Sequence, residues 1–225
     1  MGQQIQLKGR LITEDRKPVP HTRVGIADES ARTDGNGRFT IALSSKLRDD
    51  ERLVVIVEKK DWVINQPLDG EFTLATISQK DRQSFEVVIA PLGSKAFWTD
   101  ARIEKELSQQ SNQAKGFAVD EFMQALAQRY GSTPEVTKEA FNNWAATQNN
   151  IGNTLKEQAA SVEGPEAARL FGEAAAAYRR ALSVLTRESR PEDWATTQHD
   201  LGYVLQEQGM RTNGLDAAGL GHDSA

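Results

Sequence analysis

The sequence predicts a chain in two parts, an N-terminal Greek-key β-sandwich followed by a C-terminal array of α-helical hairpins. Up to Ala90 apolar residues recur at every second position, which is the period of half-buried strands. Beyond Pro91 the period lengthens to that of amphipathic helices, and a segment of about fifty residues occurs twice. The expected fold class is therefore two-domain, β plus α.

The predicted strands are short and separated by polar turns such as Asp34–Gly37. The run 53–57 is apolar on both faces, which predicts a central strand, and Phe72 and Leu74 indicate a further one. Six or seven strands of this kind are typical of a sandwich. The alternating positions are Ile5, Leu7, Leu11, Val24, Ile26, Phe39, Ile41, Leu43, Phe85, Val87 and Ile89.

Composition excludes several classes of protein. The 225 residues include no cysteine, which removes disulfides, thiol nucleophiles and cysteine-ligated zinc. No apolar run reaches the ~20 residues that span a bilayer, and the first residues lack signal-peptide features, so we expect a cytoplasmic protein that does not enter membranes. The net charge of −5 comes entirely from residues 93–225, so nucleic acid is not an expected partner.

No motif of a known catalytic site is present. The chain has neither a nucleophile elbow, a zinc-protease motif, a phosphate-binding loop nor a dinucleotide fingerprint, and its three histidines are far apart in the sequence. Asp34–Gly37 is interpreted as a hairpin turn, because a calcium site needs more carboxylates. We therefore expect no enzymatic activity, no catalytic residues, no metal and no cofactor.

The N-terminal pattern resembles the carboxypeptidase regulatory-like domain. The resemblance is carried by Gly9–Ile12, the segment Lys17–Ile26 and the segment Thr33–Phe39. It implies a transthyretin-like sandwich over residues 4–90, a domain that generally has no catalytic role of its own. We expect an accessory β-domain.

The C-terminal repeat is unusually regular. Residues 144–170 align with residues 194–220 without a gap, and twelve of the 27 positions are identical. Such repetition is typical of helical arrays, in which each hairpin needs a neighbour to cover its apolar stripe. Trp144 and Trp194 are expected in the core.

The repeat resembles the long-helix variants of the tetratricopeptide family. The resemblance is carried by Gly152 and Leu155 on the first helix of a unit, and by Ala174, Tyr178 and Ala181 on the second. The expected stripes are Phe141, Trp144, Ala145, Gln148, Ile151, Gly152 and Leu155 on the first helix, and Ala167, Leu170, Phe171, Ala174, Tyr178, Ala181, Leu182 and Leu185 on the second.

The expected domain limits follow from these patterns. The sandwich covers 1–92, a helical connector 93–132 with helices near 97–113 and 117–131, the repeats 133–214, and a truncated repeat or disordered tail 215–225. Because Gly214 aligns with Gly164, a second helix is expected to begin there. The incomplete last unit leaves Trp194, Leu201 and Leu205 as an uncovered stripe, which predicts self-association or partner binding.

The tetratricopeptide resemblance also implies a ligand-facing side of each first helix. Polar side chains at those positions can orient the amides and carboxylate of a bound peptide. The implied residues are Asn149, Asn153, Lys156, His199, Tyr203 and Gln206.

The sequence thus favours a non-enzymatic protein–protein interaction module, a scaffold or adaptor that presents a groove to a peptide or partner protein. One alternative is a structural fragment of a larger repeat-containing effector or signalling protein. Another is carbohydrate binding by the β-sandwich, for which Trp62 is the aromatic candidate.

Overall fold

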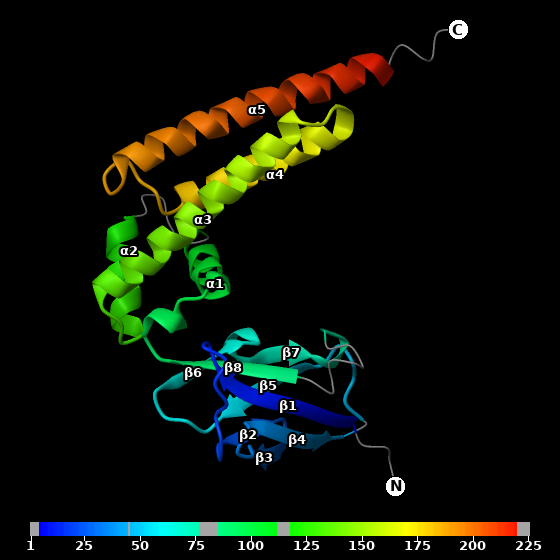
Figure 1. Ribbon diagram of the computed structural model, residues 1–225, viewed down its shortest axis with the longest axis vertical. Helices are drawn as coiled ribbons and strands as arrows, with labels where there is room; N and C mark the ends of the chain where they lie inside the picture. The colour runs from blue at the N-terminus through cyan, green and yellow to red at the C-terminus, as the bar shows by residue number, and fades with distance from the viewer. Residues whose placement is uncertain (1–4, 45, 77–84, 112–117, 220–225) are drawn as a thin grey trace. The chain divides into compact units, whose positions relative to one another are not determined.

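The computed structural model describes residues 5–44, 46–76, 85–111 and 118–219 (Figure 1). The described residues form two four-stranded sheets and five α-helices, which confirms a mixed β plus α class. They divide into two compact units, one drawn from Met1–Glu106 with Ala127–Thr133 and the other from Leu107–Leu126 with Pro134–Ala225. Each unit is described by itself.

The first sheet has the strand order β4-β1-β8-β6 and the second the order β3-β2-β5-β7 (Figure 1). All neighbouring strands are antiparallel except β1 and β8, which run parallel. The strand bounds are β1 Ile5–Thr13, β2 Arg23–Ile26, β3 Glu29–Arg32, β4 Arg38–Leu43, β5 Arg52–Val57, β6 Trp62–Gln66, β7 Glu71–Thr73 and β8 Phe85–Pro91.

One hydrophobic cluster draws side chains from both sheets. The alternation of β1 illustrates its origin, since Leu7 and Leu11 are buried while Lys8 and Arg10 are exposed. Between them Gly9 faces inward beneath the Phe39 ring, and a methyl group there would lie 2.3 Å from Phe39 Cζ. Only glycine fits at this position without moving the ring.

The strands differ from the expected set in three ways. β3, which is almost entirely polar, and β6 were not expected. Leu74 lies in a short 3-10 turn after β7 and not in a strand. β5 is central in its sheet, but Val54 and Ile56 are 43% and 59% exposed. An antiparallel sheet needs only one buried face, so apolar residues on the other face of β5 lie at the surface.

The turn Asp34–Gly37 is not the hairpin that was expected. It leads from β3 in one sheet to β4 in the other, because β3 pairs with β2 and β4 with β1. Asp34 Oδ1 accepts hydrogen bonds from the backbone N–H groups of Arg38 and Asn36, both at 2.8 Å, and these bonds lower the pKa of the Asp34 carboxyl. Gly37 takes the left-handed φ of 74° that the turn requires.

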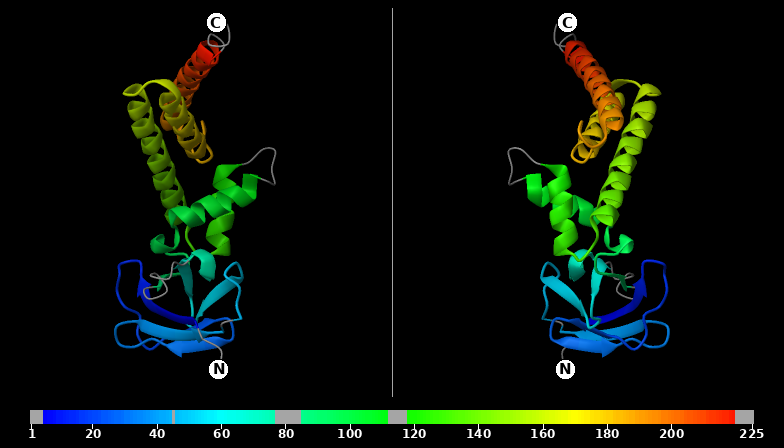
Figure 2. Two further views of the ribbon diagram at one scale, coloured as in Figure 1. Left: turned by 90° about the vertical axis from the view of Figure 1, so that its right-hand side faces the viewer. Right: turned by 90° about the vertical axis from the view of Figure 1, so that its left-hand side faces the viewer.

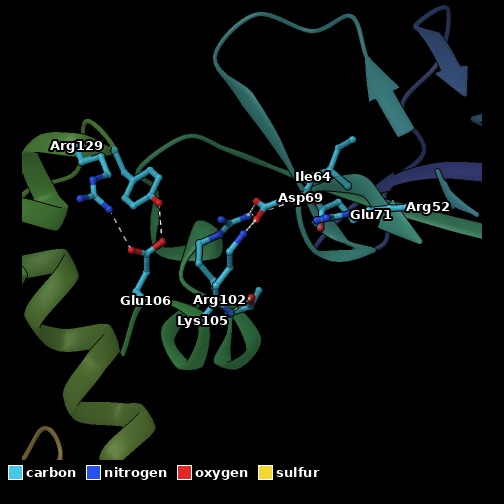
Figure 3. Close-up of polar contacts among 10 residues, drawn as sticks. Arg52, Ile64, Asp69, Glu71, Arg102, Lys105, Glu106 and Arg129 are labelled. Atoms are coloured by element: carbon cyan, nitrogen blue, oxygen red, sulfur yellow. Dashed lines mark hydrogen bonds and ion pairs between the residues drawn. The ribbon is translucent and has the colours of Figure 1, made fainter. Parts of the chain in front are cut away.

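The first turns of helix α1 (Asp100–Ser111) are tied to the loop between β6 and β7 (Figure 3). The buried Arg102 guanidinium lies 2.8 Å from Asp69 Oδ1 and also donates to the Ile64 carbonyl at 3.3 Å, while Lys105 pairs with the same Asp69 carboxylate. Burial alone would raise the pKa of Asp69, but the bonds from Lys105 and Arg102 outweigh it and lower the pKa. These contacts hold the first turns of α1 against the segment Ile64–Asp69.

The remaining helices are α2 Val119–Arg129, α3 Pro134–Ala160, α4 Gly164–Leu182 and α5 Pro191–Gly219. The two connector helices are close to expectation, although α1 begins three residues later than 97 and Phe117 lies outside the described residues. Helix α4 packs against both α3 and α5 (Figures 1 and 2). Trp144 is 3% exposed, which confirms its place in the core, whereas Trp194 is only half-buried.

The expected second helix at Gly214 is absent, because α5 continues unbroken to Gly219. In the first unit Gly164 has a left-handed φ of 69° and Pro165 stands at the start of α4. Proline cannot continue a helix and disfavours helical geometry in the residue before it, so the chain must break there. Leu215 replaces proline in the second unit and imposes no break.

Candidate partner-binding face on helix α5

The contact between α3 and α4 centres on one glycine. A methyl group at Gly152 would lie 2.6 Å from Tyr178 Cε1 and 2.8 Å from two further ring atoms. The Tyr178 ring is fully buried, and its hydroxyl donates to Asn153 Oδ1 at 2.7 Å. Burial raises the pKa of the Tyr178 hydroxyl. The missing side chain of Gly152 therefore allows α4 to approach α3 closely.

Polar side chains align the same two helices. Gln148 is 4% exposed, and its Oε1 accepts a hydrogen bond from Arg180 Nε at 2.7 Å. A buried amide is costly unless it is paired, so this bond favours one register of α4 on α3. The contact therefore combines a glycine and an amide on α3 with an aromatic ring and a guanidinium on α4.

Helix α5 contacts α3 and α4 through a different stripe of residues. Val204 is fully buried in the cluster formed with α4, and the Arg211 guanidinium lies 4.7 Å from the centre of the Phe171 ring. Lys156 Nζ of α3 lies 2.8 Å from Asp200 Oδ1. Burial alone would lower the pKa of Lys156, but the bond to Asp200 outweighs it and raises the pKa.

The six residues implied by the tetratricopeptide resemblance fall into two groups. Those on α3 have partners inside the unit: the Thr197 hydroxyl lies 3.0 Å from Asn149 Oδ1, Asn153 holds Tyr178, and Lys156 pairs with Asp200. Those on α5 face outward, namely His199, Tyr203 and Gln206. Their role in binding stays a prediction for both groups.

The internal repeat identifies a second surface on α5. Five α3 residues are packed toward α4 or the core around it: Ala145, Gln148, Gly152, Leu155 and Ala159. All of them are buried except Leu155, which is half-buried. Fifty positions later every equivalent residue is exposed: Ala195, Gln198, Gly202, Leu205 and Gly209. We call these five residues the α5 outer face. Apart from its chain neighbours and the adjoining backbone of α5, no described residue has an atom within 4 Å of a methyl group placed at Gly202.

The outer face carries no charged side chain along about 20 Å of helix. The sequence indicated part of it, since Leu205 is 37% exposed as the uncovered stripe requires. Leu201, by contrast, packs against the buried cluster, and Ile151 of the expected α3 stripe is 39% exposed. The repeat alignment contained the signal for the other positions, since adding fifty to the number of each α3 residue packed toward α4 gives the residues of the face. They are exposed because the helix that covers α3 has no described counterpart on α5.

Other candidate chemistry has less support. Among the described residues no group of three His, Asp or Glu side chains could hold a metal ion. No helix within the described ranges is both long and apolar enough to cross a membrane. Trp62 is half-buried against the sheet core with the Lys59 ammonium 4.7 Å from its ring centre, so its ring is already engaged.

Comparisons of the chain with family models, curated proteins and solved structures found no match.

Proposed function

We propose that this chain is a non-enzymatic interaction module whose α5 outer face binds an α-helix of a partner protein. The observation that carries the proposal is the fifty-residue equivalence between this exposed face and the buried α3 face toward α4. An exposed helix face made of small, apolar and amide residues is a docking surface of the helix-in-groove type.

The α3–α4 contact defines the chemistry of the partner. The partner helix places an aromatic ring over Gly202, as Tyr178 covers Gly152, and a guanidinium against the Gln198 amide, as Arg180 does with Gln148. The small residues Ala195 and Gly209 of the α5 outer face allow the partner helix to approach α5 closely. His199, Tyr203 and Gln206 lie beside this face and contribute orientation rather than most of the buried area.

We also propose a specific fold for each part of the chain. The single hydrophobic cluster with side chains from both sheets supports a Greek-key sandwich, which we interpret as an accessory domain. The glycine–tyrosine contact between α3 and α4 supports a tetratricopeptide-like hairpin with lengthened helices. If the partner helix follows in the same polypeptide, the chain acts as a segment of a larger repeat protein, and the docking chemistry is unchanged.

A labelled peptide of residues 164–185, which is α4 with the three residues that follow it, is the direct probe, because α4 already fits the equivalent face of α3. Fluorescence anisotropy with the full chain should show saturable binding. Gly202→Ala should weaken it about tenfold or more, since the added methyl occupies the place of the ring. Thr196→Ala is the matched control, because Thr196 is exposed off the face and its α3 equivalent is already alanine.

A Tyr178→Ala change in the peptide alone should also abolish binding. Equal binding by the parent chain and Gly202→Ala would contradict the assignment of the face. Light scattering without peptide separates self-association from partner binding, since two α5 outer faces packed together would give a concentration-dependent dimer that Gly202→Ala disrupts.

A further inference from the structure

The outer surface of the first sheet carries a concentration of positive charge that helix docking does not use. Lys8 and Arg10 of β1 and Arg38 of β4 point away from the core and line a cavity of about 300 Å³. Glu86 of β8 is the one carboxylate in its lining. Residues 1–92 carry no net charge, so this cluster is a local excess of positive charge.

The nearby carboxylates are already engaged. Glu86 accepts two hydrogen bonds from the Arg16 guanidinium, both at 2.9 Å. Asp34 accepts backbone bonds within its turn. Arg10 Nε donates to the Asn36 carbonyl at 3.1 Å, and no ion pair to Lys8 or Arg38 exists within the described ranges. The Asp34 carboxylate also lies in the field of Arg38 and Arg10, which lower its pKa further. Four cations, Lys8, Arg10, Arg16 and Arg38, thus face two carboxylates, and positive charge around the cavity is in excess.

The register of the strands makes this arrangement costly. Arg10 lies directly opposite Arg38 in the β1–β4 ladder, and Lys8 lies opposite Thr40. Like charges directly opposite each other destabilise a sheet. Two guanidinium groups beside an ammonium group form instead a set of donors suited to an anion with two charges and several oxygens, which is the chemistry of a phosphate group.

We propose that this cavity binds the phosphate group of a small phosphorylated metabolite, with Arg10 and Arg38 donating to its oxygens and Lys8 supplying a third positive charge. The cavity volume is at the low end of the range of about 300–1,000 Å³ for small-molecule sites. That size favours a compact phosphate monoester. The site is independent of the α5 outer face.

Titration of the full, isotope-labelled chain with glycerol 3-phosphate tests the site, with glycerol and inorganic phosphate as the comparison arms. Backbone amide signals of Gly9, Arg10 and Thr40 should shift in a saturable way with glycerol 3-phosphate and not with glycerol. A similar response to inorganic phosphate would show that the phosphate group is the recognised part, and a much weaker one that the ester carbons contribute. Arg38→Gln should weaken binding about tenfold or more, because it removes charge-assisted hydrogen bonds.

Lys60→Gln is the charge-matched control, since Lys60 is exposed in the same unit and outside the cavity lining. It should leave affinity within about twofold, because an exposed charge beyond the cavity is largely screened. A second readout does not depend on the ligand's identity. Without phosphate, Arg38→Gln should unfold at a higher temperature than the parent chain, and glycerol 3-phosphate should reverse that order.

Three results would overturn the proposal. The first is the lack of a saturable amide shift with both glycerol 3-phosphate and inorganic phosphate. The second is equal affinity for glycerol 3-phosphate in the parent chain and Arg38→Gln. The third is a loss of affinity in Lys60→Gln as large as that in Arg38→Gln. Any of them would leave the cations as charges that protect the edge strand β4 from pairing with other chains.

Discussion

Adding one methyl group should stabilise the helical unit at Gly202 and should fail to stabilise it at Gly152. Both glycines are at the same place in the repeat and inside long helices, so Gly→Ala gains about 1 kcal/mol of helix propensity at each. At Gly202 nothing described beyond the adjoining residues of α5 lies within 4 Å of the methyl, so the gain is kept. At Gly152 the methyl would lie 2.6 Å from the Tyr178 ring.

The ring cannot easily move away. Tyr178 is 0% exposed, and its hydroxyl is bonded to Asn153. Overpacking a closely packed contact of this kind costs about 1–3 kcal/mol. Because the propensity term is common to both variants, their difference should equal this cost. Gly202→Ala should therefore be more stable than Gly152→Ala by about 1–3 kcal/mol.

Urea unfolding followed by circular dichroism at 222 nm measures the difference through the helices. Unchanged steepness of the transition in both variants would show that the midpoint shift reports stability. Equal midpoints for Gly152→Ala and Gly202→Ala would refute the reasoning, because the two faces of the repeat would then be packed alike. The same Gly202→Ala protein serves in the peptide-binding experiment, where a loss of binding cannot be attributed to unfolding.

The remaining predictions concern buried polar groups. Lys156→Met should destabilise the chain by about 1–3 kcal/mol, since it leaves the largely buried Asp200 unpaired, and a double-mutant cycle with Asp200→Asn should show strong coupling. Asp69→Asn should destabilise the chain at pH 7 by leaving buried Arg102 without its carboxylate. Because the folded-state pKa of Asp69 lies below its ordinary value of 3.8, that stabilisation is present above pH ~4 and is lost as the pH falls through the folded-state pKa, so urea midpoints of parent and variant should converge in acid. Trp144→Phe should cost less than a typical large-to-small core change when measured by thermal unfolding, because Trp144 Nε1 is buried without a hydrogen-bond partner among the described residues.

Much of the architecture could be predicted from periodicity because burial on one face leaves a regular trace in the sequence. The alternation in β1 and β4 and the helical spacing in α3 and α4 are of this kind. Strand β3 carries no such trace, since its polar residues are held by backbone pairing with β2. The break at Gly164 was predictable from Pro165, but the alignment of Gly214 with Gly164 suggested a break that the backbone of α5 does not make.

By itself the sequence determined that a segment with helical periodicity recurs at fifty residues, with a glycine at the same place in each copy. Only the tertiary structure decided which copy of that glycine is covered. Identical residues at Gly152 and Gly202 are buried in one copy and exposed in the other, because burial depends on whether a neighbouring helix is present and not on the residue. The pairing of Arg10 with Arg38 likewise depends on strand register, which joins residues far apart in the chain.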